Sequence, residues 1–272
     1  MKRADMTFDE TSPESLLAIA IGLATQAGPL AVAMRHGAAS NPDTKSSPVD
    51  LVTAADKAVE AQLVSGILSA RPNDSIFGEE GADNIGTTNV RWILDPIDGT
   101  TNYVYDRLDY SISIAVEVAG EVVAGVVHRP ATNTMYAAAK GRGATANGTP
   151  ITCSTPDNLS VSLIGTGFGY NPDRRKAQAE VLVTLLPLVR DIRRGGSAAL
   201  DLCAVACGQS DAYYERGLNY WDFAAGWLIA TEAGAVVTGL TTDQPDETFL
   251  IAASPTIRAP LLALLQGVVV DE

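Results

Sequence analysis

Apolar residues recur at helical spacing in two segments near the N-terminus. The first covers about 14–36 and directly follows a Ser-Pro pair, which suits a helix N-cap and first turn. The second covers about 54–70, where Thr53 stands at the N-cap position and Asp56 follows three residues later, as in a capping box. The pattern therefore predicts two helices ahead of the first strands.

Short apolar runs bounded by turn residues then predict strands. In the first half they lie at 90–94, in a hairpin that turns at Gly120, and at 135–139, which indicates an antiparallel sheet. In the second half strands and helices alternate. The predicted strands there are 161–165, a short one at 192, 211–215, 235–238 and 250–253, and the predicted helices are 175–188, 197–207, 221–233 and 256–265.

This change of pattern near residue 150 predicts an α/β (α+β) fold of two subdomains, 1–150 and 151–272. The first would carry most of the candidate metal ligands, and the second would complete a substrate pocket. No linker rich in Pro, Gly or Ser separates them, so we expect one compact unit.

The charge balance excludes some function classes. The chain has 272 residues and a net charge of −13, and no run of Lys or Arg stands out, so a nucleic-acid-binding surface gains no support. Acidity by itself usually reflects solubility, but clustered carboxylates bind hard cations. The positions of the carboxylates therefore decide what the charge means.

Cysteines and hydropathy indicate the compartment. Three cysteines, at 153, 203 and 207, are an odd number with no zinc or redox spacing, which is typical of a reduced, cytoplasmic protein. The N-terminal residues lack an apolar signal core. No stretch reaches the ~18–20 uncharged apolar residues of a membrane span, so the 14–36 segment is interpreted as a core helix and no membrane partner is expected.

Candidate chemistry is concentrated in residues 92–102. An apolar strand ends at Asp95, Asp98 follows three residues later, and Gly99 and Thr100 suit a helix start whose backbone N–H groups bind an anion. Carboxylates beside an anion site repel that anion unless cations lie between them. Bound Mg²⁺ that bridges carboxylate and phosphate is the simplest solution.

Two further acidic patches could complete such a site, the Glu79-Glu80 pair and Asp222. Each patch also has an ordinary interpretation: a turn for residues 95–99, a solvated surface pair for the glutamates, and a helix cap for Asp222. Spacing alone does not show that the three patches meet.

Taken together, these motifs make the chain similar to the inositol monophosphatase family. The Ala-rich sequence and the segment Gly165-Thr-Gly-Phe-Gly-Tyr170 resemble the branch found in actinobacteria. The matching motifs span residues 45–226 in the family's order. They are Lys45-Ser-Ser-Pro-Val-Asp50-Leu-Val-Thr53-Ala-Ala-Asp56, Gly78-Glu79-Glu80, Asp95-Pro-Ile-Asp98-Gly99-Thr100-Thr101-Asn102, Gly196-Ser197-Ala198-Ala199, and Glu215 through Trp221-Asp222 to Gly226. Departures are small, such as Ser197 where many members have Thr.

The resemblance implies a layered αβαβα sandwich, a homodimer and two to three Mg²⁺ ions per site. It implies hydrolysis of a phosphomonoester by metal-activated water. The implied roles are metal binding by Glu79, Asp95, Asp98, Asp222 and the Ile97 carbonyl, catalysis by Glu79, Thr100 and Asp56, phosphate binding by Gly99 and Thr100, and substrate binding by Asp98, Ala198, Glu215 and Asp222.

Several substrates fit this resemblance. An inositol monophosphate is the first expectation, with histidinol phosphate, fructose 1,6-bisphosphate, a nucleotide 3′-phosphate or a non-catalytic binding role as alternatives. No basic cluster is evident near the pocket, which argues against a second phosphate, although Arg193 and Arg194 leave that option open. The histidines, His36 and His128, lie outside every motif, so a Ser-His-Asp site is not supported and both are interpreted as structural or surface residues.

Overall fold

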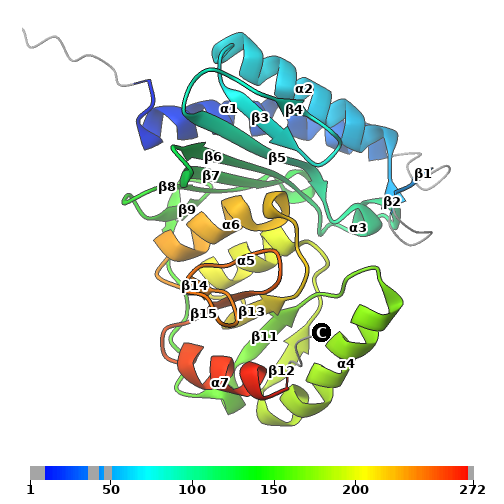
Figure 1. Ribbon diagram of the computed structural model, residues 1–272, viewed down its shortest axis with the longest axis vertical. Coiled ribbons are helices and arrows are strands. Elements are labelled where there is room, and N and C mark those ends of the chain that lie inside the picture. The colour runs from blue at the N-terminus through cyan, green and yellow to red at the C-terminus, as the bar shows by residue number, and fades with distance from the viewer. Residues whose placement is uncertain (1–9, 36–42, 46–50, 269–272) are drawn as a thin grey trace, which may run out of the picture.

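The computed structural model describes residues 10–35, 43–45 and 51–268, and these form five alternating layers of helix and sheet (Figure 1). One layer is an eight-stranded sheet with strand order β10-β9-β8-β7-β6-β5-β3-β4, and another is a five-stranded sheet with order β12-β11-β13-β15-β14. The strands of the first sheet are β3 (Ser75–Gly78), β4 (Asp83–Asn84), β5 (Val90–Asp98), β6 (Ser111–Val118), β7 (Glu121–Arg129), β8 (Thr134–Ala139), β9 (Ala144–Ala146) and β10 (Thr149–Ile151). Those of the second are β11 (Leu163–Thr166), β12 (Asp191–Arg193), β13 (Ala212–Glu215), β14 (Val236–Thr238) and β15 (Leu250–Ala253).

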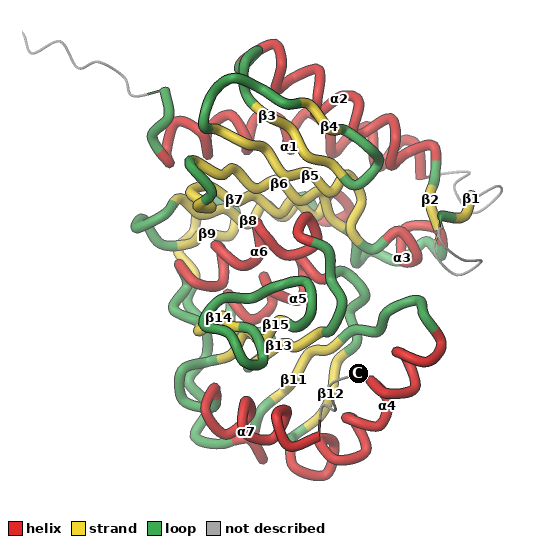
Figure 2. The backbone as a smooth tube through the Cα atoms, in the orientation of Figure 1, coloured by secondary structure: helices red, strands yellow, loops and turns green. Residues whose placement is uncertain are grey.

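Helices fill the remaining three layers, because each sheet has apolar side chains on both faces. Helices α1 (Pro13–Arg35) and α2 (Ala54–Ala70) share one hydrophobic cluster with the outer face of the first sheet. Helices α5 (Ala198–Ala206) and α6 (Tyr220–Glu232) pack between the two sheets, as Figure 2 shows. Helices α4 (Pro172–Leu185) and α7 (Arg258–Val268) cover the far face of the second sheet. The short elements β1 (Asp43–Thr44), β2 (Leu51–Val52) and α3 (Thr100–Val104) lie near one end of the first sheet.

This arrangement confirms the predicted αβαβα sandwich, and most element boundaries agree within a few residues. One difference bears on function: the strand predicted to end before Asp95 continues as β5 to Asp98. Another is that α4 begins at Pro172 rather than at 175, because the Asn171 side chain accepts hydrogen bonds from two N–H groups of its first turn. The division of the chain near residue 150 stays a prediction.

Helix α1 is long and apolar enough to cross a membrane, judged by length and composition alone. In the structure one of its faces is buried against the first sheet and α2, which agrees with a core helix. The buried His128 of β7 reaches this helix, with Nδ1 3.1 Å from the carbonyl oxygen of Ala24, and burial lowers the pKa of the imidazole. His128 is therefore structural, whereas His36 lies outside the described residues.

Candidate active site

A β-bulge brings the two aspartates of β5 onto one face of the sheet. Asp95 pairs with Ser113 and Asp98 with Ser111, so three residues on β5 match two on β6. Side chains three apart on a regular strand point to opposite faces, but the extra residue turns both carboxylates to the same side. That side faces α5 and α6, because Ser111 lies 3.2 Å from Ser197 and Ser113 donates to the carbonyl of Trp221 at 3.5 Å. The turn interpretation of this segment is therefore wrong.

The Asp98 carboxylate is held at the N-terminus of α5. Its Oδ2 atom accepts hydrogen bonds from the Ser197 hydroxyl at 2.5 Å and the Ala199 N–H at 2.8 Å. Burial nevertheless raises the pKa of Asp98 to about 6, since these donors offset only part of the desolvation and the carboxylate of Glu79 adds repulsion. Asp98 thus links the first sheet to the central helix layer.

The Glu79-Glu80 pair follows β3 in a tight loop that depends on a third glutamate. The carboxylate of Glu60, buried on α2, accepts the N–H of Glu80 at 2.9 Å and that of Ala82 at 3.0 Å. Gly78 leaves the space that this carboxylate occupies, because a Cβ atom there would lie 2.3 Å from Oε2. The sequence analysis did not identify Glu60; its only indication there is an acidic residue beside the apolar stripe of its helix.

Thr100, at the start of α3, connects to the beginning of α2. Its hydroxyl lies 3.2 Å from Oδ1 of Asp56 and 3.1 Å from the carbonyl of Ile97. The other oxygen of Asp56 accepts the N–H and hydroxyl of Thr53, which completes the predicted capping box. Burial raises the pKa of Asp56 to about 6.

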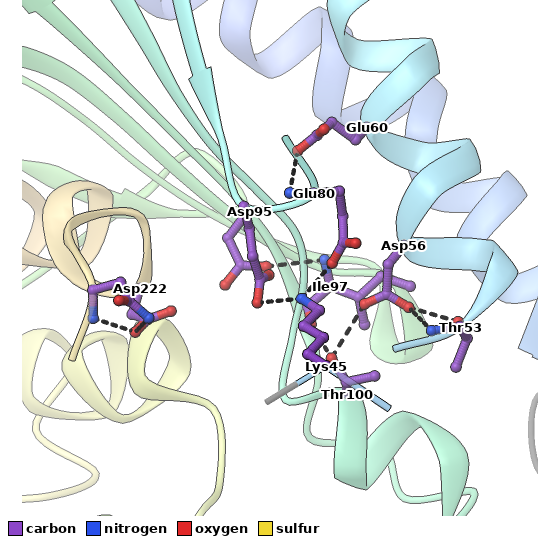
Figure 3. Close-up of polar contacts among 11 residues, drawn as sticks. Lys45, Thr53, Asp56, Glu60, Glu80, Asp95, Ile97, Thr100 and Asp222 are labelled. Carbon is purple, nitrogen blue, oxygen red and sulfur yellow. Dashed lines mark hydrogen bonds and ion pairs between the residues drawn. The ribbon is translucent and has the colours of Figure 1, made fainter. Parts of the chain in front are cut away.

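Asp222 lies in the first turn of α6, which belongs to the helix layer between the two sheets (Figure 3). It caps this helix, since Oδ2 accepts the N–H of Asn219 at 2.6 Å. Burial, followed by repulsion from Asp98 and Glu79, raises its pKa well above the usual range. The helix-cap interpretation and the candidate metal role therefore apply to the same side chain.

The predicted site residues, apart from Asp56, line one cavity of about 530 Å³. Asp56 does not line it but lies behind Thr100, to which it is hydrogen-bonded. The lining includes Glu79, Asp95, Ile97, Asp98, Gly99, Thr100, Ala198, Glu215 and Asp222. Spacing alone left open whether the three acidic patches meet, and the fold brings them together.

The donor set of this cavity fits a hard cation. Burial, with repulsion from Glu79, Asp98 and Asp222, raises the pKa of Asp95 well above its usual range, so nearby positive charge would favour the ionised carboxylate. Carboxylate and carbonyl oxygens are the ligands that Mg²⁺ prefers. Within the described part of the chain, no three Asp, Glu, His or Cys side chains are arranged closely enough to hold a metal ion as they stand.

Lys45 neutralises the glutamate side of this cavity. Its ammonium lies 2.8 Å from Glu79 and 2.5 Å from Glu80 (Figure 3). Burial disfavours its charge, but the two carboxylates more than offset this and raise the pKa of Lys45. A metal ion at Glu79 would therefore have to displace this ammonium or share the carboxylate with it.

The same cavity also contains Glu215 and positive charge. The hydroxyl of Tyr213 donates to Glu215, and burial raises the pKa of Glu215 to about 7. Arg174 and Arg194 also line the cavity, whereas Arg193 is paired with Asp191 on the exposed surface at 2.6 Å. Of the two arginines that the sequence left open, Arg194 lines the cavity and Arg193 does not, and Arg174, which the sequence analysis did not name, joins it.

Comparison with known proteins identifies the family. A model of the inositol monophosphatase family matches residues 12–269. The chain belongs to this family. An inositol-1-monophosphatase from Mycobacterium leprae is 44% identical and covers 96% of this chain and 97% of its own. A protein from Salmonella typhimurium called Nus factor SuhB is 39% identical, covering 71% and 73%. The solved structure of Mycobacterium tuberculosis SuhB superposes with a TM-score of 0.82 at 41% identity and covers 94% of this chain and 98% of its own.

Membership of the inositol monophosphatase family has two plain consequences. The chain is a phosphomonoester hydrolase, and it belongs to a family whose chemistry is generally metal-dependent. Its cavity of clustered oxygen donors agrees with both.

Gly99 has a backbone conformation and close surroundings that favour glycine. Its φ is +89°, and a Cβ atom would lie 3.0 Å from the Asp109 carbonyl and 3.1 Å from that of Gly196. We expect Gly99→Ala to lower the free energy of unfolding by about 1–2 kcal/mol and to reduce phosphatase activity. Urea denaturation and phosphate release would measure the two effects.

Gly120→Ala is the matched control, because Gly120 also has a positive φ of +83° but no atom within 4 Å of its added Cβ. It should lose stability with no loss of specific activity. Full activity of Gly99→Ala would show that this backbone position does not shape the site.

Proposed function

We propose that this chain is a Mg²⁺-dependent phosphatase that converts an inositol monophosphate and water to inositol and phosphate. The observation that carries the proposal is the convergence of Glu79, Asp95, Asp98 and Asp222 with Thr100 in one cavity. A volume of about 530 Å³ suits a small polyol phosphate. The names of the relatives from Mycobacterium support the same substrate.

We assign metal binding to Glu79, Asp95, Asp98, Asp222 and the Ile97 carbonyl. Two to three Mg²⁺ ions, when bound, would neutralise phosphate charge and activate the attacking water. Thr100 and Glu79 orient that water, and Asp56 holds the Thr100 hydroxyl through the 3.2 Å hydrogen bond. No protein nucleophile is needed, since phosphoryl transfer depends mainly on positioning and charge stabilisation.

The substrate's two ends contact different walls of the cavity in this proposal. The N–H groups of Gly99 and Thr100 bind the phosphate. The hydroxyl groups of the alcohol contact the carboxylates and backbone at Asp98, Ala198, Glu215 and Asp222. A homodimer in the cytoplasm, with no nucleic-acid or membrane partner, remains part of the proposal.

Three observations favour alternative functions. The carboxylate of Glu215 could receive the cationic group of histidinol phosphate in place of a hydroxyl. The name of the Salmonella relative, Nus factor SuhB, keeps a binding role on this fold as a second candidate. A fructose 1,6-bisphosphate substrate is favoured by the arginines of the cavity.

Phosphate release from inositol 1-phosphate, histidinol phosphate and fructose 1,6-bisphosphate, each with Mg²⁺ and with EDTA, tests these functions. We expect a preference for the inositol ester that EDTA abolishes. A preference for another ester would replace the substrate and leave the metal assignment. No release from any ester would favour the binding role.

The raised pKa values predict that metal-free protein loses stability as the pH rises. Because Asp56, Asp98 and Glu215 have pKa values of about 6, 6 and 7, the folded chain binds more protons than the unfolded chain between about pH 4 and pH 7. The shift of Asp98 from 3.8 to about 6 alone corresponds to about 3 kcal/mol. The lowered pKa of His128 acts in the opposite direction, but it is a single group.

In EDTA we therefore expect the melting temperature to be about 5 °C lower at pH 7.5 than at pH 5. Mg²⁺ should raise it again at pH 7.5, since a ligand of the folded state stabilises that state. Glu215→Gln should reduce the pH dependence, because it removes one of the titrating groups. Equal melting temperatures at both pH values would contradict the prediction.

A further inference from the structure

One glutamine side chain joins the two loops that border Glu215. Gln178 is buried on the inner side of α4. Its Oε1 atom accepts the N–H of Gly169 at 3.0 Å, and its Nε2 atom donates to the carbonyl of Arg216 at 3.3 Å. Gly169 follows β11 and Arg216 follows β13, and these two strands pair in parallel. A single amide group therefore ties together the loops at the ends of two neighbouring strands.

Both of these loops touch Glu215. Arg216 is its next neighbour in the chain. The carboxylate of Glu215 also lies directly against Gly167, because a Cβ atom on that glycine would overlap Oε2. Tyr213, on the same strand as Glu215, holds the carboxylate to its own strand. The contact with Gly167 depends instead on the position of a second loop, the one that Gln178 holds.

A second cavity, of about 220 Å³, adjoins the first at Glu215. Glu215 lines both cavities, and the second is also lined by Gly167, Gln178 and Arg216. The wall at Glu215 is therefore not backed by closely packed side chains on every side. Since close packing does not fix this wall, its position depends on the hydrogen bonds that hold the loops.

Arg174, one turn before Gln178 on α4, packs against the same two loops. Its Cδ atom would lie 3.1 Å from a Cβ atom on Gly169, and its guanidinium lies against Gly217. These are contacts of a long side chain, whereas the amide of Gln178 makes directional hydrogen bonds to both loops. The spacing of the loops is therefore set at Gln178.

We infer that Gln178 is a positioning residue for alcohol specificity, because it holds the two loops that place the Glu215 carboxylate against the hydroxyl groups of the substrate. This inference rests on the proposed function, which assigns those hydroxyl groups to Glu215. Loss of the amide would leave an N–H donor on one loop and a carbonyl acceptor on the other without their partner. The loops would then shift, and the carboxylate with them.

The competing explanation is that Gln178 only stabilises the fold. A purely structural role predicts a lower melting temperature and unchanged kinetic constants, for every ester, in the enzyme that remains folded. A positioning role predicts weaker binding of esters whose alcohol carries hydroxyl groups. An alcohol without hydroxyl groups makes no hydrogen bond to Glu215, so its ester would be unaffected.

Inositol 1-phosphate and cyclohexyl phosphate separate these explanations, since both are esters of a six-membered carbon ring and the second lacks the free hydroxyl groups. Cyclohexyl phosphate is measured by its turnover or as a competitive inhibitor, at saturating Mg²⁺. Gln178→Met keeps the approximate volume of the side chain and removes the amide. We expect it to raise KM for inositol 1-phosphate by about tenfold, with a smaller change in kcat. The constants for cyclohexyl phosphate should change by less than about twofold.

Gln266→Met is the matched control. Gln266, on α7, also donates from its amide to a backbone carbonyl, that of Leu240 at 2.8 Å, and it lines neither cavity. This variant should keep the wild-type constants for both esters. Gln178→Asn is a second variant at the site, because its amide is one methylene too short to reach both loops, and it should raise the same KM.

An unchanged KM for inositol 1-phosphate in a folded Gln178 variant, or an equal loss for both esters, would overturn the inference and leave the proposed function in place. Failure of both Gln178 variants to fold would favour the structural explanation and overturn it as well. No turnover of inositol 1-phosphate by the wild type would overturn the proposed function and this inference with it.

Discussion

Asp95→Asn is expected to lower Mg²⁺-dependent phosphate release by more than about 100-fold, the upper range for residues that only orient metal ligands. Asp95 is 1% exposed at the bulge of β5, and it lines the cavity together with Glu79, Asp98 and Asp222. The proposed function makes it one of the metal ligands. Its replacement would remove one negative charge at the centre of the site while keeping the shape of the side chain.

The same variant should fold normally. Because burial and neighbouring carboxylates raise the pKa of Asp95, its charge destabilises the metal-free fold, and asparagine removes that cost. In EDTA near neutral pH we expect a melting temperature at or above that of the wild type. Asp83→Asn, on the exposed strand β4, is the control and should retain activity.

Mg²⁺ titration with a calorimetric readout would show whether Asp95 acts through the metal. Binding should weaken in Asp95→Asn and stay unchanged in Asp83→Asn. An Asp95→Asn enzyme with wild-type activity would refute the metal assignment.

Glu60→Gln is expected to weaken Mg²⁺ binding by about 10–100-fold. The two carboxylate oxygens of Glu60 accept the N–H groups of Glu80 and Ala82. Glutamine has a single acceptor oxygen, so its amide group would face one of these N–H donors and the loop would shift. The displaced loop carries Glu79, the proposed ligand that lines the cavity.

A positioning role for Glu60 predicts a specific kinetic pattern. The Mg²⁺ concentration for half-maximal activity should rise, with a smaller change in kcat at saturating Mg²⁺. Lys57→Gln, an exposed change on the same helix, should leave both values as in the wild type. An unaltered Mg²⁺ requirement in a folded Glu60→Gln enzyme would show that Glu60 has no part in metal binding.

Local interactions explain why much of the fold is readable from the sequence. The capping box at Thr53 and Asp56 depends on residues three apart, and the structure contains it as predicted. Boundaries were less accurate where pairing decides them. β5 runs on to Asp98 because β6 continues to pair with it beyond the bulge, and nothing within residues 95–98 specifies that partner.

Positive charge in the cavity illustrates what the sequence could not show. Arg174 opens the short basic run Arg174-Arg175-Lys176 in the first turn of α4, and Arg194 follows Arg193 after β12. Their common position results from the packing of these segments around residues 168–169. Nothing local in either basic segment indicates that it borders the carboxylates, so the charge of the pocket depends on the tertiary structure.

The sequence by itself determined the family, the layered fold class and the identity of the candidate carboxylates, because the motifs that carry them are short and specific. Only the tertiary structure decided that Glu79, Asp95, Asp98 and Asp222 meet in one cavity, that Glu60 holds the loop, and that two arginines face the carboxylates. The physical reason is that these groups come from β3, β5, α6 and other elements far apart in the chain. Their juxtaposition depends on the bulge in β5 and on the packing of α5 and α6 between two sheets, which no local pattern encodes.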